Sequence, residues 1–98
     1  MEVYRIDPDR AAYYAPLDVL YIGYGDNSLD SCHAIEDTPS GICVMYDRNG
    51  LFAGAEIYDA SKTISGTPCV VTIDASVPFR INLPAIPGFV TKNEVVAL

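Results

Sequence analysis

Proline and glycine are spread along the whole chain, and their spacing limits the possible folds more than any other feature. Seven prolines and seven glycines divide the 98 residues into short apolar runs rich in Val, Ile, Tyr and Phe. Runs of about four to eight apolar residues between turn residues are typical of strands and leave no room for long helices. The sequence therefore predicts a mainly β domain, an antiparallel meander or curled sheet of about five to six short strands. A small α+β arrangement is the alternative if the ends of the chain are helical.

Six strands are expected from these runs. They lie at residues 2–6, 18–24, 41–46, 51–59, 69–74 and 77–83. The clearest connection is Asp47-Arg48-Asn49-Gly50, because Asn-Gly tolerates the positive φ angles that a tight turn requires. Residues 41–59 are therefore predicted to form a central hairpin.

The two ends of the chain carry weaker signals. Residues 9–14 are compatible with one helical turn, and Thr91 and Glu94 have the spacing of a capping box. For residues 88–98 the sequence leaves helix, strand and disorder open.

Apolar residues lie on both faces of the expected strands. Val19 and Tyr21, for example, alternate with Leu20 and Ile22. A small curved sheet with exposed edges and two apolar faces is a poor monomer, so a homodimer is expected. The length allows one hydrophobic core and rules out a second domain, so residues 1–98 are expected to form a single domain.

Acidic residues outnumber basic ones by 13 to 6, which gives a formal net charge of −7 at pH 7. Direct binding to nucleic acid draws most of its affinity from Lys and Arg side chains that neutralise phosphates. The composition therefore argues against nucleic acid as a direct partner. A basic protein is the partner that the charge favours.

The cysteines and the apolar stretches bear on location. Cys32, Cys43 and Cys69 are an odd number at wide spacing, unlike a secreted disulfide framework. No apolar stretch approaches the roughly 20 residues that a membrane-spanning helix needs, and the charged N-terminal segment does not resemble a signal peptide. A cytoplasmic location without membrane contact is expected.

Residues for nucleophilic or metal chemistry are few. His33 is the only histidine, and the neighbouring Cys32 would point to the opposite side of an extended segment. Cys43 and Cys69 lie in apolar runs and are interpreted as core residues, with a reach to His33 through the fold as the minor alternative. The scattered ligands lack the paired spacing of a zinc site. No catalytic residue, metal ligand or cofactor is predicted, and a non-enzyme is favoured over an enzyme.

Acidic residues between the second and third expected strands offer oxygen ligands for a hard cation. They are Asp26, Asp30, Glu36 and Asp37. Their spacing fits no EF-hand loop, so a solvated loop is the favoured interpretation.

Glu56 is the one acid that stands inside an expected strand, between Ala55 and Ile57. Alternation places it on the same face as Phe52 and Tyr58. It is expected either at the solvent side of a half-covered face or as a partly buried acid held by a hydrogen-bond partner. A bond that stabilises the fold is favoured over a catalytic role.

Two segments carry a resemblance to a known family. The first reads Tyr-Ala-Pro-Leu-Asp-Val-Leu-Tyr-Ile at residues 14–22, and the second reads Tyr-Asp-Arg-Asn-Gly-Leu-Phe-Ala-Gly-Ala-Glu-Ile-Tyr-Asp-Ala-Ser-Lys at residues 46–62. Together they resemble domain of unknown function 2283, an uncharacterised family of small prokaryotic proteins. Its members read Tyr-Asp-Pro-x-x-Asp-x-Leu-Tyr-Ile and then Asp-x-x-Gly-x-x-x-Gly-x-Glu-Ile-Leu-x-Ala-Ser. The match covers residues 13–62, and Ala15, Ala55 and Tyr58 depart from the pattern.

The positions that match the family pattern are all interpreted as structural. They are Tyr14, Pro16, Asp18, Leu20, Tyr21, Asp47, Gly50, Gly54, Glu56, Ile57, Ala60 and Ser61. Gly50 suits a positive φ in the hairpin loop, and Gly54 suits a bulge or close packing. Asp47 can bond the loop backbone, and Asp18 either caps its strand or pairs across the sheet.

The resemblance implies a small sheet-forming protein without established catalytic residues, and some members are similar in genomic setting to antitoxins. The leading hypothesis is a non-enzymatic protein–protein interaction module, antitoxin-like, whose acidic surface binds a basic partner such as a toxin nuclease. The alternative is a small enzyme or ligand-binding domain with a tyrosine-lined pocket. The tyrosines expected in that pocket are Tyr13, Tyr14, Tyr21, Tyr24, Tyr46 and Tyr58.

Overall fold

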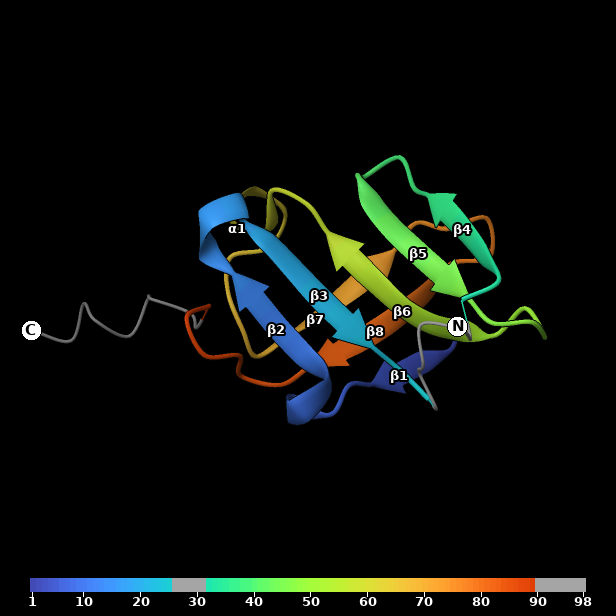
Figure 1. Ribbon diagram of the computed structural model, residues 1–98, viewed down its shortest axis with the longest axis horizontal. Coiled ribbons are helices and arrows are strands. Elements are labelled where there is room, and N and C mark those ends of the chain that lie inside the picture. Colours follow the sequence, from blue (N-terminus) through green and yellow to red (C-terminus); the bar gives the residue numbers. More distant parts are fainter. Residues whose placement is uncertain (26–31, 90–98) are drawn as a thin grey trace, which may run out of the picture.

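The computed structural model describes residues 1–25 and 32–89, and in these residues the chain forms two sheets that face each other (Figure 1). The smaller sheet has the strand order β1-β8-β7. Its strands are β1 (Val3–Arg5), β7 (Cys69–Ile73) and β8 (Phe79–Leu83). The larger sheet has the order β2-β3-β6-β5-β4. Its strands are β2 (Ala11–Tyr14), β3 (Val19–Gly23), β4 (Ala34–Asp37), β5 (Ile42–Tyr46) and β6 (Phe52–Ile57).

The predicted mainly β class is confirmed, and all strand pairs are antiparallel except β1 with β8. The strands of the smaller sheet run across those of the larger sheet (Figure 1), as in orthogonally packed sandwiches. The arrangement differs from the single meander or curled sheet that was expected, because the strands divide between two sheets. In the described residues the helices are limited to short turns. They are η1 (Pro8–Arg10), η2 (Ala15–Leu17) and α1 (Ala60–Thr63).

Each of the six expected strands is present, and β2 and β4 are additional. The predicted helical turn at residues 9–14 is wrong beyond Arg10, because Ala11–Tyr14 pairs with β3. One isolated helical turn gains little stability, whereas pairing with β3 gives this edge strand backbone hydrogen bonds along one side. The segment of β4 contains two acids in four residues and so lacks an apolar run that would mark it.

The predicted hairpin is formed by β5 and β6. Gly50 has a φ of 77°, and its N–H donates to the carbonyl of Asp47 at 3.0 Å. The Asp47 carboxylate accepts from the N–H groups of Asn49 and Leu51 at 2.8 and 3.0 Å. The predicted roles of Gly50 and Asp47 are therefore confirmed.

A β-bulge shifts the register near the start of β6. Met45 pairs with Gly54 and Tyr46 pairs with Phe52, so Ala53 is the extra residue. An extra residue turns the neighbouring side chain to the other face, and Phe52 accordingly lies in the core. The expectation that Glu56 shares a face with Phe52 is wrong for this reason.

The hydrophobic core fills the space between the sheets. The larger sheet supplies Leu20, Ile22, Ile42, Val44, Phe52, Ala55 and Ile57, and the smaller sheet supplies Val71, Ile73, Phe79, Ile81 and Leu83. Gly54 lies where a Cβ atom would come within 2.7 Å of the carbonyl oxygen of Ile22. The close packing predicted for Gly54 is therefore required by the approach of β3 to β6.

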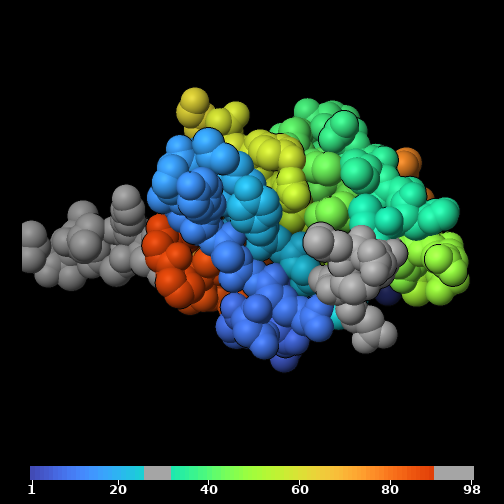
Figure 2. All heavy atoms as spheres, in the orientation of Figure 1, coloured from blue at the N-terminus to red at the C-terminus, as the bar shows by residue number. Residues whose placement is uncertain are grey.

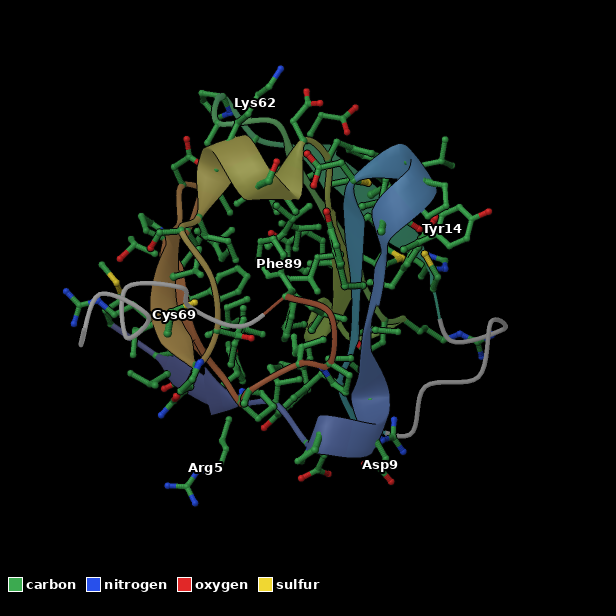
Figure 3. The ribbon with its side chains drawn as sticks, turned by 90° about the vertical axis from the view of Figure 1, so that its left-hand side faces the viewer. Arg5, Asp9, Tyr14, Lys62, Cys69 and Phe89 are labelled. Carbon is green, nitrogen blue, oxygen red and sulfur yellow. The ribbon has the colours of Figure 1, made fainter. Side chains whose placement is uncertain are left out.

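One end of the sandwich is closed by the segment that follows β8. Ile86 and Phe89 belong to the hydrophobic core and are 1% and 8% exposed, and Figure 3 shows Phe89 between the sheets. The ring of Phe89 lies 4.5 Å from the ring of Tyr13, measured between centroids. The Thr67 hydroxyl holds the segment, because it donates to the carbonyl of Phe89 at 2.6 Å and accepts from the N–H of Ile86 at 2.8 Å. Residues 90–98, including the expected capping box, lie outside the described residues.

The outer faces of both sheets carry exposed apolar side chains. On the smaller sheet Val70, Thr72, Arg80 and Asn82 point outward, and Val70 is 59% exposed. The larger sheet exposes 40% of Tyr21, 50% of Tyr14 and 63% of Ile35. In the described part of the chain, no helix has the length and apolar character needed to cross a bilayer.

Candidate functional site

A cleft of about 550 Å³ opens between the sheets at the end opposite Phe89. The hairpin loop, β4, β1 and the connection from β7 to β8 surround it. In Figure 2 the loop at residues 47–51 lies beside β4, far from the segment that carries Phe89. The lining residues are Met1, Glu2, Tyr4, Ala34, Glu36, Tyr46, Gly50, Leu51, Phe52, Ser76, Val77, Pro78 and Phe79.

Aromatic rings form the floor of the cleft. The ring centroids of Tyr4, Phe52 and Phe79 lie 4.9 to 5.4 Å from one another. Tyr24 packs against Tyr4 at 5.0 Å and against Phe52 at 5.5 Å. Offset and edge-to-face contacts at these distances make a rigid apolar surface.

The rim of the cleft is also apolar. Met1, Leu51 and Val77 are 70%, 60% and 79% exposed. Exposed apolar side chains that surround a concave apolar surface are typical of a binding site rather than of an ordinary solvated surface.

The polar part of the cleft is centred on the Glu36 carboxylate, which stands on the inward face of β4. Its Oε1 accepts from the Tyr46 hydroxyl at 2.8 Å. Its Oε2 accepts from the backbone N–H of Ser76 at 2.7 Å and from the Ser76 hydroxyl at 2.8 Å. The Ser76 donors come from the smaller sheet's connection, so these bonds join the two sheets across the cleft.

These bonds set the protonation states in the cleft. The Tyr46 hydroxyl, followed by the Ser76 donors, lowers the pKa of Glu36 below its ordinary value. Burial, followed by the bond to Glu36, raises the pKa of Tyr46 to about 12. Near neutral pH the cleft therefore holds an ionised carboxylate and a protonated phenol.

This chemistry suits binding better than catalysis. The Ser76 hydroxyl donates to Glu36, but a carboxylate with a lowered pKa is a weak base and does not activate a serine nucleophile. Tyr46 is a hydrogen-bond donor at neutral pH rather than a base. Within residues 1–25 and 32–89, no group of three or more His, Cys, Asp and Glu is placed to hold a metal ion.

The two family-like segments meet at the opposite end, and the residues that join them support the fold. The Asp18 carboxylate accepts from the N–H and hydroxyl of Ser61 at 3.0 and 2.6 Å and from the Tyr13 hydroxyl at 2.6 Å. The carbonyl of Asp18 accepts from the N–H of Ala60 at 2.9 Å. Ser61, then Tyr13, lowers the pKa of Asp18. Asp18 thus ties the start of β3 to α1.

The other matched positions are spread over the fold. Leu20 and Ile57 lie in the core, Tyr14 and Tyr21 are exposed, and Pro16 lies in η2. Glu56 is half-buried and accepts from the Tyr58 hydroxyl, which agrees with its predicted structural role. Gly50 is the one matched position that lines the cleft.

The six tyrosines expected in one pocket are not brought together in the cleft, because Tyr46 is the only one of them that lines it. Tyr13 instead packs on Phe89, and Tyr58 is 45% exposed. Tyr4, which the prediction left out, lines the cleft in their place.

Sequence reasoning also missed the role of Glu36. The structure places Glu36 on β4, half-buried, and not in a solvated loop. Asp37 lies on the same strand and is exposed, whereas Asp26 and Asp30 lie outside the described residues. The one sequence signal that could have indicated the partner of Glu36 is the tripeptide Asp-Ala-Ser, which occurs at residues 59–61 and 74–76. Each of its serines binds a carboxylate from a distant segment.

No protein-family model matches the chain, and no curated protein or solved structure matches it significantly.

Proposed function

We propose that this protein is a non-enzymatic protein–protein interaction module that binds a basic partner through the cleft at the open end of the sandwich. The observation that carries this proposal is the combination of an aromatic floor with an ionised carboxylate. Of the described residues that line the cleft, two are Glu and none is Lys or Arg. A cationic side chain with an apolar stem complements such a surface.

The charge of the whole chain supports the same partner. The formal net charge of −7 attracts a basic protein from a distance and raises its rate of association. We place the protein in the cytoplasm. The resemblance to domain of unknown function 2283 stays a prediction, and with it an antitoxin-like role against a basic partner such as a toxin nuclease.

A small-molecule binding site is the second candidate, and the size of the cleft favours it. Ligand pockets commonly enclose about 300–1,000 Å³ and combine apolar walls with a few polar groups, and the cleft has about 550 Å³. An uncharged aromatic ligand bound in the cleft, with no binding of basic peptides, would support this alternative.

The test compares one substitution at two exposed valines. Val77 lies on the rim of the cleft, whereas Val70 lies on β7 and is 59% exposed. Val77→Arg puts a positive charge at the mouth of the cleft, and Val70→Arg adds the same charge elsewhere. Binding of a polybasic peptide, measured by calorimetry at low salt, should weaken several-fold in Val77→Arg and remain near the wild-type value in Val70→Arg. Equal effects of both substitutions, or no binding by the wild type, would contradict the proposal.

We also propose that two copies associate through the outer face of the larger sheet. Tyr21 and Ile35 are exposed there beside the half-buried Met45, and burial of such a face favours a symmetric dimer. Light scattering should give twice the monomer mass for the wild type and the monomer mass for Tyr21→Glu. A monomeric wild type at high micromolar concentration would remove this proposal.

A further inference from the structure

The same hydrogen-bonded group of three residues occurs at both ends of the sandwich. At the closed end the Asp18 carboxylate accepts from Tyr13 and from the N–H and hydroxyl of Ser61. At the open end the Glu36 carboxylate accepts from Tyr46 and from the N–H and hydroxyl of Ser76. We call these the closed-end and open-end triads.

The closed-end triad has two further neighbours. Phe89 covers the ring of Tyr13, with 4.5 Å between centroids. Lys62 follows Ser61 in α1, and its positive charge helps to lower the pKa of Asp18. The carboxylate thus has a cation near it, and the tyrosine has a flat group against it.

The open-end triad has neither a basic side chain nor a covering ring among the described residues of the cleft. The lining contains no Lys or Arg, and the nearby carboxylate of Asp74 raises the pKa of Glu36. Tyr46 is half-buried and faces the cleft. The Glu36 carboxylate has about four acceptor positions and uses three, so Oε1 retains one.

We propose that the open end binds an arginine side chain of the partner protein, whose guanidinium donates to Oε1 of Glu36 while its flat face lies on the ring of Tyr46. One arginine supplies both the cation and the flat cover that the closed-end triad has. Guanidinium is planar and stacks on aromatic rings, whereas the ammonium of lysine is a strongly hydrated point charge that does not stack. The methylene stem of the arginine lies against the apolar rim at Leu51 and Val77. This inference rests on the proposed function and names the group that the cleft recognises.

The first experiment varies the ligand and leaves the protein unchanged. Three short capped peptides carry a central arginine, lysine or citrulline between two leucines, and binding is followed by NMR shifts of backbone amides. Citrulline keeps the planar shape but has no charge. The arginine peptide should shift the amides of Tyr46 and Ser76, and the citrulline peptide should bind at least about tenfold more weakly because it loses a charge-assisted bond. The lysine peptide should also bind several-fold more weakly.

The second experiment varies the protein with a matched control. Glu36→Gln and Glu56→Gln make the same change, and both glutamates accept from a tyrosine hydroxyl, but only Glu36 lines the cleft. Affinity for the arginine peptide should fall at least about tenfold in Glu36→Gln and stay within about twofold in Glu56→Gln. Tyr46→Leu, which keeps an apolar group but removes the ring, should weaken binding several-fold.

The outcomes separate this inference from the proposed function. Equal binding of the arginine and lysine peptides in the cleft overturns the arginine site and leaves a module for basic partners. Equal binding of the arginine and citrulline peptides overturns the role of charge at Glu36. If no peptide shifts the cleft amides, the proposed function fails as well. The ligand series remains decisive even if Glu36→Gln does not fold.

Discussion

The two ends of the sandwich carry similar hydrogen-bonded triads, but one end is filled by chain and the other is open. At one end the Asp18 triad is packed beneath Phe89, and the segment that follows β8 fills the space between the sheets. At the other end the Glu36 triad borders a cleft of about 550 Å³. The difference indicates that the triads hold segments of chain together wherever they occur. What distinguishes the open end is that no described segment covers its rings.

The largest effect on stability is expected from removal of the Phe89 ring, which covers Tyr13 at the closed end. Phe89→Ala deletes a ring that is 8% exposed and packs on Tyr13, which should lower the free energy of unfolding by about 3 kcal/mol. Val77→Ala, at the rim of the open end and 79% exposed, should change it by less than about 0.5 kcal/mol. Urea denaturation measures both. Similar losses in the two variants would show that the two ends contribute equally to stability.

The second largest effect on stability is expected in the hairpin loop that forms one wall of the open end. Gly50 has a φ of 77°, and a Cβ atom there would meet nothing within 4 Å. Gly50→Val should therefore destabilise the fold by about 1–2 kcal/mol through backbone strain alone. Arg48→Val in the same loop should have a much smaller effect on the thermal unfolding midpoint. Negligible shifts in both variants would contradict this account of the hairpin.

The two ends also differ in how much of their structure could be predicted from the sequence. The hairpin was predictable because Asp47, Asn49 and Gly50 signal a turn over four neighbouring residues. The cleft was not, because Tyr4, Glu36 and Ser76 come from three distant segments and meet only when two sheets face each other. Simple alternation along the strand also predicted the wrong face for the Phe52 side chain. The bulged residue Ala53 turns that side chain to the other face of the sheet.

The unpredicted strands have a related explanation. Ala34–Asp37 has no apolar periodicity of its own, and it becomes β4 because β5 offers a partner. Its inward Glu36 is then stabilised by donors from the other sheet. Edge strands with charged residues are common because charge discourages pairing with other chains. Because of these charged residues, such strands lack the apolar runs from which strands are predicted.

The third effect is the response of the two triads to acid. The pKa values of Asp18 and Glu36 lie below their ordinary values of 3.8 and 4.5, because each carboxylate accepts hydrogen bonds from Tyr and Ser. As pH falls below these ordinary values, the unfolded chain takes up protons before the folded one does. The stability that both triads contribute is therefore complete above about pH 5 and is lost as pH falls through the folded pKa values.

The measurement is the urea midpoint between pH 7 and pH 3. Asp18→Asn and Glu36→Gln should each flatten its pH dependence in the acidic range. Ser76→Ala, which removes a donor from Glu36, should act in the same direction as Glu36→Gln. Variants as steeply pH-dependent as the wild type would show that these bonds do not link protonation to folding.

The smallest effect concerns the thiols, whose modification rates report on local exposure without changing the fold. Cys69 lies at the closed end, partly buried against the core (Figure 3), and Cys43 is partly buried on β5. Burial is the main cause that raises the pKa of both thiols, and Asp37 adds to it at Cys43. Cys32 is exposed beside β4. Because the thiolate is the reactive form, Cys32 should react first with a thiol reagent and the other two slowly, as followed by mass spectrometry of the native protein. Equal rates at all three cysteines without denaturant would mean that the core beside Cys69 opens as readily as the surface beside Cys32, and the closed end would then not be closed in solution.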